Sequence, residues 1–137
     1  MAIRVYYTPG TDGRTALQDD LAALGRLRQD AAWLETVIGD LSEADLASDF
    51  YDWHIPEVLP DAEGREVKGT WGHLRVGRTY VLMLWRYTPP KPERNLGTPV
   101  EILVDGVGKE REILRRLRDL ADELGEADGE DAGDQEA

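Results

Sequence analysis

Five cationic side chains lie close together in the middle of the chain, within a segment that alternates apolar and polar residues. The segment runs from Gly64 to Tyr87, and its cations include Lys68, His73, Arg75, Arg78 and Arg86. Arginine suits phosphate because its planar guanidinium matches phosphate geometry and stays charged. His73 is the one side chain of the set whose unperturbed pKa suits proton transfer near neutrality. These residue types indicate a phosphate-binding surface, which Lys109 and Arg111 extend.

RNA cleavage without a metal needs this combination of side chains. A 2′-hydroxyl attacks the adjacent phosphate, charge on the phosphorane is stabilised, and the leaving 5′-oxygen is protonated. Arginines anchored on strands suit the second task, because a sheet holds them rigidly. On chemistry alone, the pattern predicts phosphate binding and no more.

A second group of candidate residues is aromatic and lies between Phe50 and Pro56. Trp53 and His54 can form one wall of an RNA-binding site, with the tryptophan face stacking on a base. The alternative is that the cluster packs in the core under a loop, as buried aromatic residues commonly do.

The net charge of the 137-residue chain is −12, but its distribution is uneven. Residues 1–63 carry a charge of −9, residues 64–118 carry +6, and residues 119–137 carry −9. Screening limits the reach of the flanking acids to about 10 Å at ordinary salt, so the basic middle can attract an anionic partner. Alternatively, these cations only line solvated faces of strands and a helix.

Composition excludes several kinds of site. The chain has no cysteine, which excludes disulfides, cysteine-ligated zinc and thiol catalysis. With only two histidines, His54 and His73, we expect no metal site and no cofactor. No run of about 20 apolar residues and no signal-like N-terminus is present, so we expect a cytoplasmic protein without membrane contact.

Local patterns predict the elements that position these residues. Residues 3–7 alternate as a strand, and helical spacing follows from Thr15 to near Gly39, which predicts either two helices separated at Gly25 or one long helix weakened there. Ser42 and Asp45 form a variant of the capping box, which predicts a short helix. Pro56, Pro60 and Gly64 then predict a loop.

The second half of the chain predicts a hairpin, a strand and a helix. The hairpin turns at Gly77-Arg78, and a proline-rich loop follows at 88–99. A strand at 100–104 is halted by residues 105–108, and a helix spans 109–124. Residues 125–137 form an acidic tail that we expect to be disordered. Residues 1–124 therefore predict a single α+β domain, with N-terminal helices and a C-terminal helix packed on a small, mainly antiparallel sheet.

Two motifs carry a resemblance to a known family. They are the run Lys68-Gly-Thr-Trp-Gly-His-Leu-Arg-Val-Gly-Arg-Thr-Tyr-Val-Leu82 and the run Val100-Glu-Ile-Leu-Val-Asp-Gly-Val-Gly-Lys109. With the order of elements, they resemble the RelE/HigB toxin superfamily over residues 64–118. The resemblance implies a RelE/ParE-like fold. It also implies an mRNA endoribonuclease that cuts on the ribosome and is neutralised by a partner antitoxin.

The resemblance also implies roles for individual residues. Lys68, Arg75 and Lys109 match the family's phosphate-binding positions. Charge and alternation add further candidates, so the predicted catalytic set is Lys68, His73, Arg75 and Arg78, and the predicted RNA-binding set is Trp53, His54, Arg86, Lys109 and Arg111. The chain departs from the family in being acidic overall and in carrying Lys109-Glu110-Arg111 in place of paired lysines.

Two hypotheses of different classes follow. The first is a ribosome-dependent endoribonuclease of a toxin–antitoxin pair. The second is a non-catalytic acidic binding protein on the same scaffold, such as a phage-derived inhibitor, whose acidic helices or tail engage a basic partner. The sequence is compatible both with a monomer and with a homodimer formed through the hairpin edge or the last helix.

Overall fold

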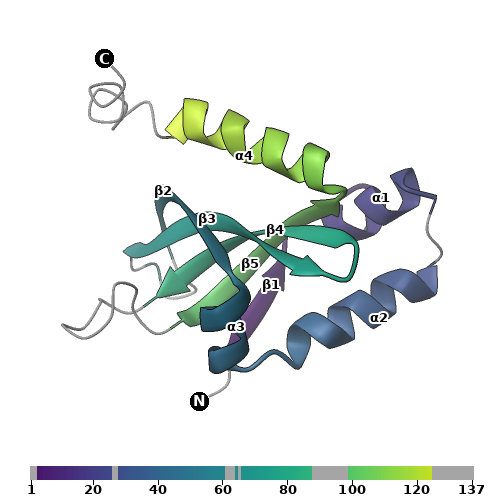
Figure 1. Ribbon diagram of the computed structural model, residues 1–137, viewed down its shortest axis with the longest axis horizontal. Coiled ribbons are helices and arrows are strands. Elements are labelled where there is room, and N and C mark those ends of the chain that lie inside the picture. Colours follow the sequence, from purple (N-terminus) through teal and green to yellow (C-terminus); the bar gives the residue numbers. More distant parts are fainter. Residues whose placement is uncertain (1–2, 26–27, 61–63, 65, 88–98, 125–137) are drawn as a thin grey trace.

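The computed structural model describes residues 3–25, 28–60, 64, 66–87 and 99–124. The elements are, in order, β1 (Arg4–Tyr7), α1 (Ala16–Ala23), α2 (Arg28–Gly39), α3 (Glu43–Asp49), β2 (Tyr51–Pro60), β3 (Glu66–Val76), β4 (Thr79–Tyr87), β5 (Pro99–Gly108) and α4 (Glu110–Leu124) (Figure 1). The predicted proline-rich loop, up to residue 98, and the predicted acidic tail lie outside the described residues.

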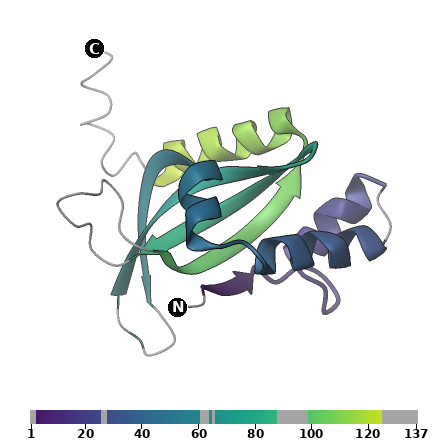
Figure 2. The same cartoon turned by 60° about the horizontal axis from the view of Figure 1, so that its bottom comes forward.

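The strands form one sheet in the order β1-β5-β4-β3-β2. All neighbours are antiparallel except β1 and β5, which run parallel. Helix α4 covers one face of the sheet, and the N-terminal helices cover the other (Figure 1, Figure 2). The predicted α+β class, with N-terminal helices and a C-terminal helix on a mainly antiparallel sheet, is therefore confirmed.

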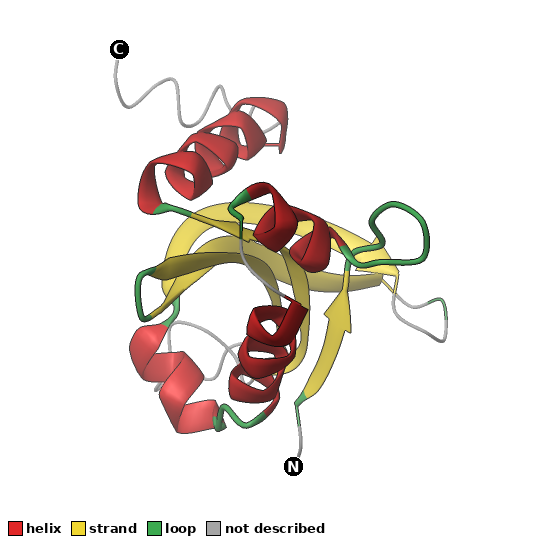
Figure 3. Ribbon diagram, turned by 90° about the vertical axis from the view of Figure 1, so that its right-hand side faces the viewer, coloured by secondary structure: helices red, strands yellow, loops and turns green. Residues whose placement is uncertain are grey.

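Each face of the sheet has its own core. Leu17, Leu21 and Leu34 of the N-terminal helices pack with Leu74 and Met83 on one face. On the other face, α4 contributes Ile113 and Leu117, which pack with Ile55, Trp71, Leu82 and Leu84. Every residue of β4 from Val81 to Arg86 is buried, because this central strand lies between both cores of the strongly curved sheet (Figure 3).

The predicted helix boundaries are confirmed at the capped ends. The Thr15 hydroxyl accepts a hydrogen bond from the Gln18 backbone N–H, and the Thr15 backbone N–H donates one to Gln18 Oε1, which completes a capping box for α1. Ser42 and Asp45 form the same arrangement for α3. Gly25 adopts φ 79°, a left-handed conformation that ends the first helical stretch, so α1 and α2 are separate helices. No described helix has the length and apolarity needed to cross a membrane.

The prediction of a loop is wrong for residues 56–60, because β2 continues through Pro56 and ends at Pro60. Proline lacks the N–H that a central strand needs, but β2 is an edge strand with only β3 beside it. The prolines that signalled a loop are therefore compatible with a strand at this position.

The predicted end of the last strand before residue 105 is also wrong, because β5 extends to Gly108. The pairing with β4 shifts between Leu82↔Gly106 and Met83↔Val104, which leaves Asp105 as an extra residue in a β-bulge. The Asp105 carboxylate accepts a hydrogen bond of 2.7 Å from the Thr8 hydroxyl. The polar, glycine-rich sequence that signalled a turn thus encodes a bulge.

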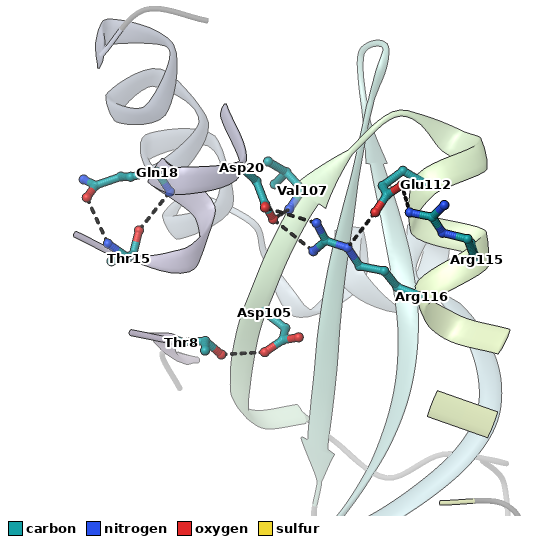
Figure 4. A network of polar contacts seen from close by, with 9 residues as sticks. All are labelled: Thr8, Thr15, Gln18, Asp20, Asp105, Val107, Glu112, Arg115 and Arg116. Carbon is teal, nitrogen blue, oxygen red and sulfur yellow. Dashed lines mark hydrogen bonds and ion pairs between the residues drawn. The ribbon is translucent and has the colours of Figure 1, made fainter. Parts of the chain in front are cut away.

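Beyond this bulge, α1, β5 and α4 are joined by one ion-pair network (Figure 4). Asp20 Oδ2 accepts hydrogen bonds of 3.0 Å from the Val107 backbone N–H and from Arg116 Nη1. Arg116 Nη2 donates to Asp20 Oδ1 at 3.1 Å, and Glu112 accepts from Arg116 Nε at 3.2 Å. A Cβ atom on Gly106 would collide with the Asp20 carboxylate and the Arg116 guanidinium, so the network requires glycine there.

Gly106→Ala is expected to lower the free energy of unfolding by about 1–3 kcal/mol, because the new methyl group displaces the Asp20–Arg116 pair. Chemical denaturation of the purified protein measures this change. Gly39→Ala is the matched control, because open space surrounds Gly39 at the end of α2, and it is expected to be neutral or stabilising by up to about 1 kcal/mol. Equal stability of Gly106→Ala and the wild type would contradict the role assigned to the network.

Candidate functional site

The turn of the β3–β4 hairpin and the first turn of α4 lie at the same end of the sheet (Figure 1). Tyr80, next to the hairpin turn, pairs with Gly108, which directly precedes Lys109 and α4. Four predicted cations are therefore brought to one end of the molecule, and all four are exposed. We call them the hairpin-end surface: Arg75, Arg78, Lys109 and Arg111.

The two arginines of the hairpin are not neutralised. Arg75 Nε donates a hydrogen bond of 2.9 Å to the carbonyl oxygen of Gly77, which fixes the side chain beside the turn. Within the described part of the chain, no carboxylate forms an ion pair with Arg75 or Arg78. The terminal nitrogens of Arg75 can therefore donate to an anion from a defined position.

Helix α4 brings acids as well as cations to this end of the sheet. Glu110 and Glu112 lie in its first turn. Glu112 is paired with Arg115 and Arg116, whereas Glu110 is exposed and acts on His73 through space. The Glu110 carboxylate thus places a negative charge beside the basic hairpin-end surface.

Beside these cations lies a group of four rings, which we call the aromatic group: Tyr51, Trp53, His73 and Tyr80. The Tyr51 ring stacks on His73 with centroids 5.2 Å apart and planes 10° apart. Tyr80 lies 5.1 Å from His73 at a tilt of 48°, and Trp53 meets it edge-on at 6.4 Å. His73 is the centre of the group, and β3 places it two residues from Arg75 on the same face.

His73 is held in its neutral form. Trp53 Nε1–H donates a hydrogen bond of 3.1 Å to His73 Nδ1, and an indole nitrogen can only donate, so Nδ1 carries no proton. Burial lowers the pKa of His73 below 6.5, and the nearby Glu110 carboxylate opposes this only in part. At neutral pH the imidazole therefore carries its proton on Nε2 and is a hydrogen-bond donor. Proton uptake at Nδ1 requires the bond to Trp53 to break, which disfavours the base role predicted for His73.

Trp53 and His54 do not form a common wall. Two extra residues in β2, between Asp52↔Gly72 and Ile55↔Trp71, form a bulge that contains both. Trp53 packs against the core beneath α4. The His54 backbone adopts φ 55°, and its side chain is 86% exposed, with Nδ1 3.5 Å from Asp52 Oδ2. The Tyr51 side chain, one position into β2, is also exposed, at 62%. The alternation of Tyr51, Trp53 and Ile55 with polar residues is the signal that would have predicted a strand here.

Arg86 does not project to solvent as predicted. It is 8% exposed, and its guanidinium lies 3.1 Å from Glu101 Oε1 and donates at 2.8 Å to the Leu59 carbonyl. Glu101 also pairs with Arg4 at 3.1 Å. Arg86 lies six positions beyond Tyr80 in β4, about 20 Å along the strand. Arg86 is therefore a structural cation, separate from the hairpin-end surface.

Lys68 is also separated from the arginines with which it was grouped. Trp71, His73 and Arg75 lie on the α4 face of β3, so alternation places Lys68 on the opposite face. Lys68 pairs with Val58, near the end of β3 that is remote from the turn. The structure therefore does not bring Lys68, Arg75 and Arg78 into one site. No group of His, Asp and Glu residues suited to a metal ion occurs among the described residues.

Glu101→Gln is expected to lower the free energy of unfolding by about 3–5 kcal/mol, because it leaves the buried Arg86 without its countercharge. Thermal and chemical denaturation measure the loss. Arg4→Gln is the matched control, because the Arg4 side chain is 53% exposed and its pair is worth about 1 kcal/mol or less. Similar losses in both variants would show that the buried Arg86 does not depend on Glu101.

Acidification below about pH 6.5 is expected to destabilise the protein through His73. In this window the unfolded histidine binds a proton while the folded one stays neutral. The free energy of unfolding therefore decreases as the pH decreases, by at most about 1.4 kcal/mol per pH unit. Trp53→Phe keeps an aromatic ring at this position but removes the N–H donor. This variant should raise the pKa of His73 and make the free energy of unfolding depend less steeply on pH. Histidine NMR titration in a His54→Gln background measures the pKa, and identical His73 titrations with and without Trp53 would contradict this account.

Comparison with known proteins yields no relative. No protein-family model, no curated protein and no solved structure matches this chain. The functional candidates therefore depend on two neighbouring features of the described residues, namely the hairpin-end surface and the aromatic group.

Proposed function

We propose that this protein is an RNA-binding endoribonuclease of the RelE/HigB type, with its site at the hairpin-end surface. The observation that carries the proposal is that Arg75 and Arg78 are exposed beside one turn and, among the described residues, free of ion pairs, with Arg75 held by its hydrogen bond to Gly77. Lys109 and Arg111 add two cations at the same end. Such a surface suits a polyanion, since each phosphate contact releases counterions and adds affinity.

In the proposed reaction, the 2′-oxygen bonds to the adjacent phosphorus as its proton passes to water. The bond from phosphorus to the 5′-oxygen breaks as that oxygen takes a proton from water, which leaves a 2′,3′-cyclic phosphate and a 5′-hydroxyl. The guanidinium groups of Arg75 and Arg78 stabilise the charge that develops on the phosphorane. Preorganised donors of this kind commonly contribute about 100- to 1,000-fold to the rate each. His73 contributes its Nε2–H as a donor rather than as a base, because Trp53 occupies Nδ1. The mechanism thus relies on electrostatic stabilisation, with mRNA on the ribosome as substrate and a cognate antitoxin as the neutralising partner.

A second candidate function has one observation in its favour. Trp33 of α2 is 56% exposed, and helices α1 to α3 contain seven acidic residues but a single basic one, Arg28. An exposed tryptophan on an acidic helical surface suits a basic protein partner, as the non-catalytic binding hypothesis requires. In that case the arginines of the hairpin would be dispensable for function.

Primer extension on a reporter mRNA in a translating extract tests the proposal. The wild-type protein, free of any antitoxin, is expected to cut at codon-spaced positions, and Arg75→Ala/Arg78→Ala is expected to lower cleavage at least about 100-fold. Both side chains are exposed, so the double variant should fold normally, as circular dichroism can verify.

Lys68→Ala is the matched control, since it removes an exposed cation from the opposite face and the remote end of β3. Cleavage by this variant at the wild-type rate would place the activity at the hairpin end. If the folded wild-type protein cuts no mRNA, the endoribonuclease proposal fails, and a partner search with Trp33→Ala as the negative control becomes the next experiment.

A further inference from the structure

From the geometry of the aromatic group we propose that Tyr51 is a stacking platform for one unpaired base of single-stranded RNA, with the adjoining phosphate at Arg75. This inference rests on the RNA binding proposed above and names the part of the RNA that the site recognises. Neither residue pattern nor charge singled out Tyr51, because its partner His73 lies 22 positions further along the chain.

The platform is an open end of a stack that spans three strands. Tyr80 of β4 contacts His73 of β3, and His73 in turn stacks on Tyr51 of β2, nearly parallel at 10°. Because β2 is the edge strand, the stack has no further strand to continue into. Tyr51 is 62% exposed although one face of its ring lies on His73. The outer face is therefore available to a planar ligand.

The stack is preorganised by its inner members. The hydrogen bond from Trp53 to His73 Nδ1 fixes the plane of the imidazole, and Tyr51 lies parallel to that plane. Trp53 itself packs against the core beneath α4 and anchors the arrangement. A base that stacks on Tyr51 thus meets a ring that is already oriented, which lowers the entropic cost of binding.

Arg75 lies where the phosphate of such a nucleotide would need a partner. Tyr51 and His73 are directly paired, so Arg75, two residues beyond His73 on the same face, is the diagonal neighbour of Tyr51, at about 7–8 Å between backbones. Its Nε is tied to Gly77, and its terminal nitrogens extend from that anchor. An aromatic face beside a fixed cation is the combination with which proteins bind single-stranded nucleic acid, largely without regard to sequence.

Fluorescence anisotropy with a labelled uridine octanucleotide tests the inference. Tyr51→Leu is expected to weaken binding roughly 5- to 100-fold, the effect of losing one base–aromatic stack. Tyr51→Phe, which keeps the ring, is expected to rescue most of this loss. Tyr6→Leu is the matched control, since Tyr6 is a 43% exposed tyrosine on the same face but on the opposite edge strand, and it should bind as the wild type does.

An abasic version of the oligonucleotide separates the base from the phosphates. On this probe Tyr51→Leu and the wild type are expected to bind equally, whereas Arg75→Gln should weaken binding to both probes and reduce its salt dependence. If the wild-type protein and Tyr51→Leu bind the octanucleotide equally well, the stacking role alone is overturned, and the exposed ring would then serve a protein partner. No binding by the wild-type protein would overturn RNA binding itself, and the stacking role with it.

Discussion

The carboxylate of Asp20 is the contact on which the arrangement of this domain most depends. Strand β1 ends at Tyr7, so the last residues of β5 have no strand on their outer side, and Asp20 accepts the free N–H of Val107 there. The same carboxylate holds Arg116 in a two-point ion pair, so α1 on one face and α4 on the other are joined through β5. Since Lys109 directly precedes α4 and Arg111 lies in its first turn, the Asp20–Arg116 pair also fixes the position of half of the hairpin-end surface relative to the hairpin.

The cations of this acidic protein serve two different purposes, and burial separates them. Arg86 is buried and pairs with Glu101, because a cation removed from water needs a countercharge. Arg116 likewise pairs with a carboxylate, that of Asp20, and this pair stabilises the packing of α1 and α4. Arg75 and Arg78 remain exposed and, among the described residues, unpaired. The net charge of −12 therefore conceals a local surface on which an anion can still be attracted, at distances shorter than the screening length.

His73 illustrates how a candidate catalytic residue can be directed toward recognition instead. Its Nδ1 accepts from Trp53, its ring is enclosed between Tyr51 and Tyr80, and burial lowers its pKa. A neutral imidazole with an occupied acceptor nitrogen transfers protons poorly near pH 7, but it orients neighbouring rings well. The surroundings of His73 therefore favour ring stacking over acid–base chemistry.

The sequence by itself determined the elements whose signals are local. The hairpin, the capping box at Ser42, the weak point at Gly25 and the amphipathic α4 follow from residues a few positions apart, and these elements together indicate the α+β class. Pro56, Pro60 and the run at 105–108 misled because a proline in an edge strand and a glycine in a bulge look like loop residues until the neighbouring strands are known. Only the tertiary structure decided that Arg86 is buried, that Lys68 faces away from Arg75 and that Tyr51 stacks on His73. The reason is that alternating side chains of one strand look alike in the sequence. Whether each is buried, paired or exposed depends on the residues of the neighbouring strands, and those strands are distant in the sequence.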